Sequence, residues 1–528
     1  MLLGWVVFFF FFWFFVLNNI DFGGWIKFNV GGYLVCDVFG FSYNNEYSSL
    51  VIFMLMICTY ISVMYSFHYF SLSNVSWLLS YIMVSFSLVM IILVMTNSFL
   101  VSLIMWEYLG LVSYILICFY DNSSSLRGAM VTLVSSRFGD VCFFILVSLY
   151  YIGGCAYVSL LGLVVFVIVS TKSALFPFIS WLLEAMRAPT PVSSLVHSST
   201  LVASGVWMVG SYYYLIGLGN NSYLVYFFQC CCFLTIVITS VCSLYYSDVK
   251  QLVALSTSNN ISWAFLILSI GDYVLAFVQL LVHAVSKCLL FTLVGDYISS
   301  SYGGQDKNQI NTNIYGNVFG LIYLFVLLVG LSGFPFMGLY FSKHVFLDSY
   351  TNIGFFSILF LFLVICGFIM SCAYSVRLFN ILFGYLSFSV YSLRVDFNMI
   401  GLVVMISSIV GNYMCFLIYS PYSFFSFLSF FVLFSLLFGV VVGAVVGCNY
   451  INYRSDWLGN LFGADFLIDM YNQYVLYIWN YLFLCLFRWE IYVFEILNDC
   501  VSFFLFSYLF KVTVLVVSVF FSLFILFF

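Results

Sequence analysis

The stretch KSALFPFISWLLEAMRAPTPVSSLVHSSTLVASGV, from Lys172 to Val206, places a lysine, prolines and a histidine inside a long apolar region. Lys172 stands five residues before Pro177, in a chain of which only 6% is charged. An unpaired charge at the centre of a bilayer costs about 2.5 to 3.5 kcal/mol on insertion scales. Such an expensive residue indicates a functional role, and the movement of ions or protons is the role it favours.

The composition around this stretch predicts a helical membrane protein with many spans. Of the 528 residues, 65% are hydrophobic, and apolar runs of ~20 residues, enough to cross a bilayer, recur along the chain. The runs are continuous rather than alternating, which excludes a transmembrane barrel. The formal net charge of −5 comes from scattered residues, so a nucleic-acid partner is not expected. We therefore predict an all-α polytopic protein within the lipid bilayer.

The cysteine pattern does not indicate a metal site. The 16 cysteines form no CxxC pair, and none lies within a helical turn of a histidine. We expect them to pack as small hydrophobic side chains.

The amino terminus, MLLGWVVFFFFFWFFVL, has neither a basic region nor a small-residue cleavage site, and it is not an Arg-rich presequence. We expect a retained first helix. The abundance of Phe, Val, Leu, Cys and Gly is the bias of T- and G-rich codons. Together these features predict synthesis inside an organelle.

Two long apolar spans contain an internal proline: Pro177 in residues 155–186 and Pro335 in residues 315–341. Proline removes a backbone donor and clashes with the preceding turn, so each span is predicted to be a broken helix. Broken helices at comparable places in two halves indicate inverted repeats that enclose a polar cavity at the midplane. Two chance prolines in an ordinary bundle are the alternative.

Residues 448–500 differ from the rest because charged residues alternate there with Trp, Tyr and Leu. The segment is too polar to span and too apolar for a linker, which favours an amphipathic helix lying along the membrane or against neighbouring subunits. An extramembrane loop with helical parts is the alternative. The predicted parts are N-terminal transmembrane helices (1–97), a first repeat (98–246), a second repeat (251–419), a transmembrane helix (420–447), the lateral amphipathic helix region (448–500) and a final transmembrane helix (501–528).

Six motifs carry a resemblance to a known family. They are WEYLGLVSYILI (Trp106 to Ile117), SSRFGDV (Ser135 to Val141), the stretch quoted above, SDVKQLVALST (Ser247 to Thr257), HAVSKCLLF (His283 to Phe291) and GFPFMGLYFSK (Gly333 to Lys343). With them the chain resembles the antiporter-like subunits of mitochondrial NADH:ubiquinone oxidoreductase, respiratory complex I, and among these the subunit 5 family. The resemblance covers most of the chain and is strongest from Trp106 to Lys343.

The resemblance implies a proton-translocating membrane-arm subunit in the mitochondrial inner membrane. Its partners would be the other membrane-arm subunits, including a subunit 4-like neighbour. No cofactor is expected in this chain, since NADH, FMN, iron–sulfur clusters and ubiquinone would be bound by partner subunits. The antiporter-like fold with its two inverted repeats and lateral helix is what the family implies for the parts predicted above.

The resemblance also implies that a series of buried titratable side chains moves protons. Its members are Glu107, Asp140, Lys172, His197, His283, Lys287 and Lys343. Glu107 is implied to be the partner of Lys172, so that moving or neutralising Glu107 would release the proton of the lysine. Asp140, one turn after Arg137, is implied to tune that pair. An ion pair that only holds two helices together is the alternative.

His283 and Lys287 are four residues apart, so on a helix they lie on one face and share access to water. His197 would relay protons between Lys172 and this pair, since histidine gains and loses a proton near neutral pH. Packing histidines held by hydrogen bonds are the alternative for both. The resemblance assigns Lys343 to the end of the path where protons leave, and a lysine there favours subunit 5 over subunit 4.

The chain departs from the family pattern in places. Ile179 and Ser180 stand where the family usually has His-Thr, and Gln279 stands where it tends to have a histidine one turn before His283. Proton paths through those histidines therefore do not carry over. The remaining polar residues of interest are expected to be boundary, interface or surface residues: Glu184, Arg187, Asp248, Lys250, His344 and Arg377.

Two other functional classes remain open. A stand-alone cation/proton antiporter would share the broken helices but would not need the segment 448–500. A purely structural membrane-arm subunit would share that segment but would not need buried lysines at three positions.

Overall fold

The structure, a computed structural model, describes most of the chain between residues 46 and 448. The described residues are 46–70, 74–96, 98–151, 158–216, 222–301, 303–307, 309, 318–334, 338–352, 358–383, 427–448, 461–463 and scattered positions from 470 to 485. The chain divides into two compact units, Met1–Ala464 and Asp465–Phe528.

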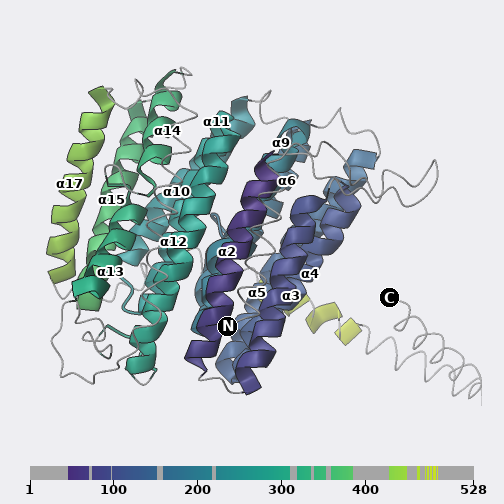
Figure 1. Cartoon of the computed structure of the whole chain (residues 1–528). Helices are drawn as coiled ribbons and strands as arrows, with labels where there is room; N and C mark the ends of the chain where they lie inside the picture. The colour runs from purple at the N-terminus through teal and green to yellow at the C-terminus, as the bar shows by residue number, and fades with distance from the viewer. Residues whose placement is uncertain are drawn as a thin grey trace, which may run out of the picture. The chain divides into compact units, whose positions relative to one another are not determined.

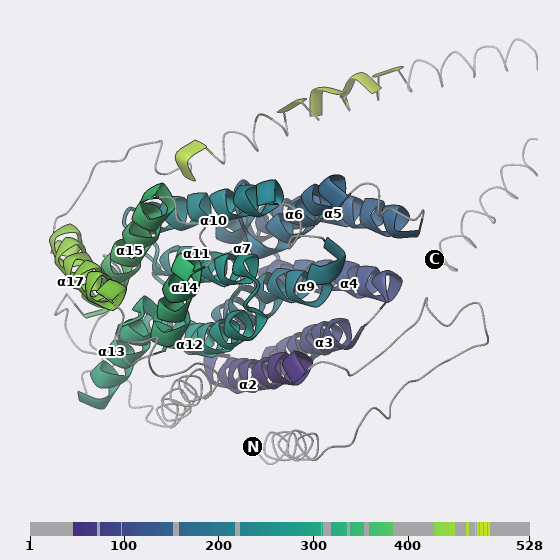
Figure 2. The same ribbon diagram turned by 90° about the horizontal axis from the view of Figure 1, so that it is seen from above.

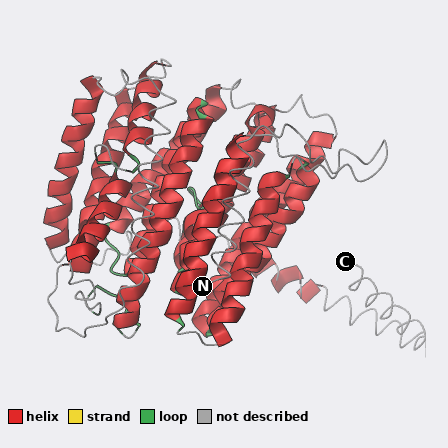
Figure 3. Cartoon of the chain, in the orientation of Figure 1, coloured by secondary structure: helices red, strands yellow, loops and turns green. Residues whose placement is uncertain are grey.

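The described part of the first unit is helical and contains no strand (Figures 1 and 3). Its longer helices are α2 (Glu46–Tyr69), α3 (Asn74–Met95), α4 (Phe99–Ile117), α5 (Ser123–Tyr151), α6 (Val158–Ser173), α9 (Leu201–Ile216), α10 (Ser222–Ser243), α11 (Val249–Ile270), α12 (Tyr273–Ser300), α13 (Val318–Ser332), α14 (Tyr340–Asn352), α15 (Ile358–Phe383) and α17 (Phe427–Cys448). Shorter pieces are η1 (Cys118–Tyr120), α7 (Ser180–Ala185), α8 (Thr190–Val192), η3 (Ser193–Thr200) and η6 (Leu461–Gly463). The all-α prediction is confirmed for the described residues.

Nine spans within the described residues are long and apolar enough to cross a membrane. Three of them are almost wholly enclosed by protein: Thr190–Ser211 is 100% buried, Val249–Ile270 94% and Tyr273–Ser299 89%, against 39% to 61% for the other six. Seen from above in Figure 2, α9 and α11 lie between a row formed by α5, α6 and α10 and a row formed by α2, α3 and α12. The centre of the bundle is therefore where charged side chains can be kept from lipid.

The turn between α11 and α12 brings these two central helices side by side in opposite directions. Gly271 ends α11 with φ +104°, a left-handed conformation that glycine adopts without strain, and its N–H donates to the carbonyl of Leu268. The next helix starts at Tyr273. The two helices pack along their length.

The chain between α6 and α9 is interrupted and locally widened. Helix α6 ends at Ser173 and α7 begins at Ser180, with Pro177 between them. After Pro189, the helical segment η3 adopts π-helical turns from Ser193 to Thr200 before α9 continues it. Such turns are rare and occur often at functional sites.

The second predicted interruption lies between α13, which ends at Ser332, and α14, which begins at Tyr340. Pro335 itself lies outside the described residues. The inverted-repeat relation of residues 98–246 and 251–419 stays a prediction.

Several predicted parts lie outside the described residues. They are the helix before residue 46, the region 384–426 and the final span after residue 500. Within the predicted lateral segment 448–500, the described positions from 470 to 485 are helical and exposed. They carry exposed Tyr474, Tyr477 and Tyr481.

Candidate proton-relay site

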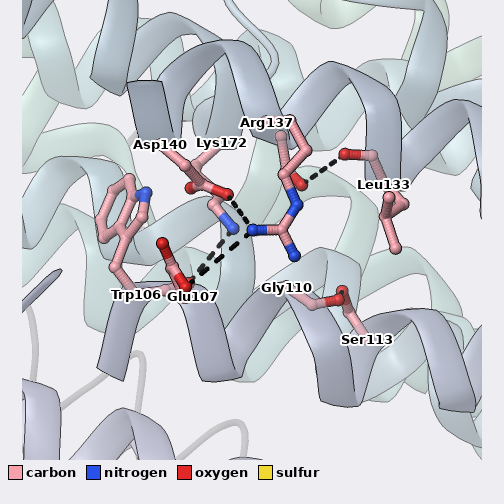
Figure 4. Close-up of polar contacts among 9 residues, drawn as sticks. Trp106, Glu107, Gly110, Ser113, Leu133, Arg137, Asp140 and Lys172 are labelled. Carbon is pink, nitrogen blue, oxygen red and sulfur yellow. Dashed lines mark hydrogen bonds and ion pairs between the residues drawn. The ribbon is translucent and has the colours of Figure 1, made fainter. Parts of the chain in front are cut away.

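Four charged residues from three helices form a cluster in the first half of the chain, which we call the first charge cluster: Glu107 on α4, Arg137 and Asp140 on α5, and Lys172 on α6. Figure 4 shows the Arg137 guanidinium between the two carboxylates. Its Nη1 lies 3.3 Å from Asp140 Oδ2 and 4.0 Å from Glu107 Oε2. Arg137 thus forms ion pairs with both acids.

The ammonium of Lys172 is held inside this cluster. The residue is 1% exposed, and its Nζ donates to the backbone oxygen of Trp106 at 3.4 Å and lies 5.5 Å from the centroid of the Trp106 indole ring. A Cβ added at Gly110 would stand 3.3 Å from Nζ, so the absence of a side chain there makes room for the ammonium. Lys172 also lies in the last turn of α6, where the helix dipole favours a cation.

A small cavity adjoins Lys172 and reaches His197. Both side chains line it, and the other lining residues are Ser113, Ile117, Thr132, Ser135, Ser136, Thr171, Trp181 and Leu201. The cavity has room for roughly one water molecule. His197 is 0% exposed, and neither ring nitrogen has a hydrogen-bonding partner among the described residues. The Lys172 ammonium and the His197 imidazole therefore line the same cavity.

A second group of titratable residues lies on the central helices of the second half. Lys287 on α12 is 1% exposed, and its Nζ bonds Ser256 Oγ and, at 3.5 Å, the carbonyl of Val253 on α11. His283 lies one turn before it and is within electrostatic range of both Lys287 and Lys343. The segment η3, which carries His197, packs on α12. The two groups are thus adjacent in the fold.

Lys343 on α14 is buried at the end of another helix. Its Nζ donates to the carbonyl of Ser332 at 3.2 Å and lies 5.6 Å from the Trp263 ring centroid. Ser332 is the last residue of α13, where backbone carbonyls are left without helical partners and the dipole favours a cation. Lys172 and Lys343 therefore have one feature in common, because each lies near the C-terminal end of an apolar helix.

Comparison with known proteins gives the family. Residues 96–370, which hold both groups of titratable residues, match the family described as NADH:quinone oxidoreductase/Mrp antiporter, transmembrane. The chain belongs to this family.

Its relatives in the NADH:quinone oxidoreductase/Mrp antiporter family include NADH-ubiquinone oxidoreductase chain 5 of several animals. The protein of Locusta migratoria is 32% identical over 410 residues, which cover 73% of this chain and 70% of that protein. The protein of Caenorhabditis elegans is 33% identical over 394 residues, covering 71% and 72%. The protein of Mytilus edulis is 36% identical over 314 residues, covering 57% and 54%.

A solved structure shares the fold. A chain in the structure of the Mrp complex from Dietzia sp. matches with a TM-score of 0.67 and 18% identity over 91% of this chain. The match covers 55% of the Mrp chain, so this chain spans about half its length. At this identity the match shows the fold alone.

The structure places the seven predicted relay residues of this family member in two adjoining groups. Glu107, Asp140 and Lys172 belong to the first charge cluster, His197 lines the cavity beside them, and His283, Lys287 and Lys343 form the second group. Glu107 is not buried as predicted, because its side chain is 32% exposed on the surface of α4. The carboxylates nearest to Arg137 are those expected beside Lys172. The direct Glu107 and Lys172 pairing and the relay roles stay predictions.

Among the other polar residues, the expected surface position of His344 is wrong. His344 is 5% exposed, and its ring centroid lies 3.9 Å from that of Tyr340, because α14 is enclosed by its neighbours. Lys250 does hold a loop, since its Nζ donates to the carbonyl of Ala188 at 3.2 Å. Arg377 donates hydrogen bonds to the carbonyls of Ser243, Tyr245 and Tyr246. It thus provides partners within this chain for carbonyls at the C-terminal end of α10.

Two groups of buried polar residues were not predicted from the sequence. The hydroxyl residues that line the cavity gave little signal, because Ser and Thr are common in transmembrane helices and bond their own backbone there. Asn259 and Asn260, both buried in α11, gave a clearer one. Two adjacent amides inside an apolar span are costly and need partners.

Within the residues that the structure describes, no group of three or more His, Cys, Asp or Glu side chains could hold a metal ion.

Proposed function

We propose that this chain is a proton-translocating membrane-arm subunit of NADH:ubiquinone oxidoreductase, a multi-pass protein of the mitochondrial inner membrane. The observation that carries the proposal is the fully buried ammonium of Lys172, which shares a cavity with His197. The imidazole of His197 has no hydrogen-bonding partner among the residues that the structure describes. A structural subunit would have no use for a buried lysine beside a cavity, because a buried charge costs free energy unless it is paired.

The first charge cluster supplies the switch. Lys172 stays protonated while Asp140 and Glu107 lie near it, since an opposite charge favours the charged form. Arg137 forms ion pairs with the same carboxylates, its Nη1 lying 3.3 Å from Asp140 Oδ2 and 4.0 Å from Glu107 Oε2. A movement that brings the carboxylates closer to Arg137 would take them away from Lys172. Without these negative charges nearby, Lys172 would release its proton into the cavity.

His197 would accept that proton and pass it on. Neither ring nitrogen has a hydrogen-bonding partner within the described part of the chain, so one can accept while the other donates. The next residues on the path would be Lys287 and His283 on α12, which packs against the segment of His197. Lys343 would receive the proton last.

Electron transfer would take place in partner subunits, which bind NADH, FMN, iron–sulfur clusters and ubiquinone. Its free energy would reach this chain as a bias between two arrangements of the first charge cluster. The side chains of Glu107 and Arg137 are 32% and 42% exposed on the surface of α4 and α5. Charges at membrane depth do not face lipid without cost, so a neighbouring membrane-arm subunit would cover them and transmit the bias.

The test is Glu107→Gln, which keeps the shape of the side chain and removes its charge. We expect the complex to assemble, while proton pumping and coupled quinone reduction fall together. Glu184→Gln is the matched control, because Glu184 is exposed to the same extent and pairs with Arg187 at 2.8 Å outside the cluster. Normal pumping by an assembled Glu107→Gln complex would remove the switch from the mechanism.

A native gel separates this proposal from a stand-alone antiporter. The purified chain should co-migrate with NADH-oxidising activity in a large complex. Cation/proton exchange by the isolated chain, with no NADH-oxidising partner, would favour the antiporter.

A further inference from the structure

A line of polar side chains runs between α11 and α12 in the buried centre of the bundle. At one end Lys287 Nζ bonds Ser256 Oγ, and at the other Gln279 Nε2 donates to the backbone oxygen of Asn260 at 3.2 Å. His283 lies four residues from both Gln279 and Lys287, so all three share one face of α12. We call these five residues the α11–α12 seam.

Three residues of the seam have polar atoms with few or no hydrogen-bonding partners. Among the described residues, Gln279 Oε1 and His283 Nε2 have none, and the side-chain amide of Asn260 meets only the Tyr374 hydroxyl. The three residues are 1%, 1% and 2% exposed. Buried polar atoms in folded proteins are almost always hydrogen-bonded, and where protein offers no partner an ordered water serves. These atoms need a bound ligand that both donates and accepts.

The charges around the seam select that ligand. Lys287 is a member of the seam, and Lys343 acts electrostatically on His283. Helix α11 contains no Asp or Glu, and α12 has none before Asp296. A metal cation would be repelled by two ammonium groups without a carboxylate to offset them, whereas water suits donors and acceptors alike.

Position 279 carries an amide, which does not take up a proton near neutral pH. A proton that travels along this face of α12 from His283 can therefore pass Gln279 only on water. Trp263, three residues after Asn260 on α11, extends the line to Lys343, whose Nζ lies 5.6 Å from the ring centroid. The seam thus leads from Lys287 to the lysine proposed as the last on the path.

We propose that Asn260 and Gln279 hold a bound water cluster against His283 and that this cluster carries protons from the Lys287 and His283 pair towards Lys343. The proposal rests on the proton-translocating function given above. Asn260 and Gln279 are positioning residues in it, because they hold the water rather than the proton.

The test compares Gln279→Leu with two matched variants in membrane vesicles that contain the assembled complex. Gln279→Leu keeps the approximate volume and removes the amide, so coupled turnover should fall roughly tenfold or more, as expected when positioned proton transfer is lost. The solvent deuterium isotope effect should rise at the same time, which a merely structural role would not cause. Gln229→Leu is the control. Gln229 is only 2% exposed, and its Nε2 donates to Ser269 Oγ, away from the seam.

Gln279→His gives a gain-of-function readout. A histidine at 279 can carry the proton itself, so turnover should be retained and acquire an inflection near the ordinary histidine pKa of about 6.5. Turnover of Gln279→His that falls as far as that of Gln279→Leu would contradict the proposal.

Lys287→Met in the same vesicles distinguishes this inference from the proposed function. If Lys287→Met pumps normally, the proton-translocating function itself fails. If Lys287→Met stops pumping while Gln279→Leu pumps at the wild-type rate, the function stands and the water cluster is wrong. Should Gln279→Leu not assemble, an experimental map of the wild-type complex decides. Water density bonded to Asn260 and Gln279 supports the proposal, and direct pairing of their amides without water overturns it.

Discussion

At position 172 of this protein, the choice of side chain follows from the free-energy cost of burying a charge. Lys172 packs against one face of α4, where its ammonium lies beside Trp106 and the side-chain-free surface of Gly110. Lysine releases its proton when its environment changes, whereas arginine stays charged. In the proposed mechanism this exchangeable proton favours lysine over arginine at this position.

The first prediction at this scale concerns the charge of Lys172. Lys172→Met should abolish pumping because no proton can be carried, and Lys172→Arg should also lose pumping because the guanidinium does not release one. The arginine variant should still assemble. Proton translocation per electron pair in reconstituted vesicles is the measurement, with assembly followed in parallel. An arginine variant that pumps normally would mean that the residue supplies only fixed charge.

Gly110→Ala tests the position of the same ammonium. The added Cβ would stand 3.3 Å from Lys172 Nζ and 3.6 Å from Ser136 Oγ, so the ammonium must shift by a few tenths of an ångström. We expect lowered pumping with a change in stability within about 1 kcal/mol, since alanine also favours the helix. Pumping assays and thermal denaturation of the complex measure the two effects. Leu111→Ala, next in α4 but exposed, should leave pumping unchanged.

At the scale of elements, backbone hydrogen bonds at the ends of helices help to fix their positions. The start of α11 is joined to the segment after α12 by a short antiparallel bridge between Asp248 and Asp306. The N–H of Val249 donates to Gln305 O, and that of Lys307 donates to Ser247 O, both at 3.2 Å. This bridge lies outside the membrane spans, and it holds the two central helices together at one end.

The bridge should weaken as the pH rises. Burial, and then the nearby Asp306, raise the pKa of Asp248 to about 6, above the value of about 3.9 in an unfolded chain. The protonated acid therefore favours the folded bridge, so its stabilisation is complete below about pH 4 and is lost as the pH rises through about 6. Hydrogen-exchange protection of Val249 and Lys307 should be higher at pH 5 than at pH 8, after correction for intrinsic rates.

Asp306→Asn checks the cause of this pH dependence. It removes one of the two carboxylates, so the difference in protection between pH 5 and pH 8 should shrink. Asp121→Asn, in the turn that follows η1, should leave the difference unchanged. Equal protection at both pH values in the wild-type chain would contradict the prediction.

At the scale of the whole molecule, the described part of the first unit combines six partly exposed spans with three spans that are almost wholly buried. The enclosed spans carry His197, His283 and Lys287, and the outer helices α4, α5 and α6 carry the first charge cluster. This arrangement allows a polar path inside a chain that is 65% hydrophobic. Unit Asp465–Phe528 is compact by itself, and its described part exposes aromatic side chains suited to an interface.

Truncation after residue 447 tests the role of that unit. We expect the distal membrane arm to detach or lose stability, because the alternating aromatic and charged residues of 448–500 suit contact with neighbouring subunits. Native gels of the truncated complex should show a smaller species. An intact full-size complex would mean that the segment is only a loop.

The amino-acid sequence by itself determined the helical membrane class, the position of the interruption at Pro177 and the identity of the buried lysines. These follow from local rules: the length of apolar runs, the missing N–H of proline and the cost of a charge in lipid. The motifs also sufficed to predict the family, which the comparisons confirm.

Only the tertiary structure decided which side chains meet. Arg137 lies between the two acids, His197 shares a cavity with Lys172, and Gln279 meets Asn260. Sequence periodicity tells which face of a helix a residue occupies, but which helix covers that face depends on packing between segments far apart in the chain. In this protein that packing depends on small features such as the missing side chain of Gly110, which leaves space for Lys172 of a neighbouring helix. A local sequence pattern does not reveal such a feature, because the residue that it affects belongs to another helix.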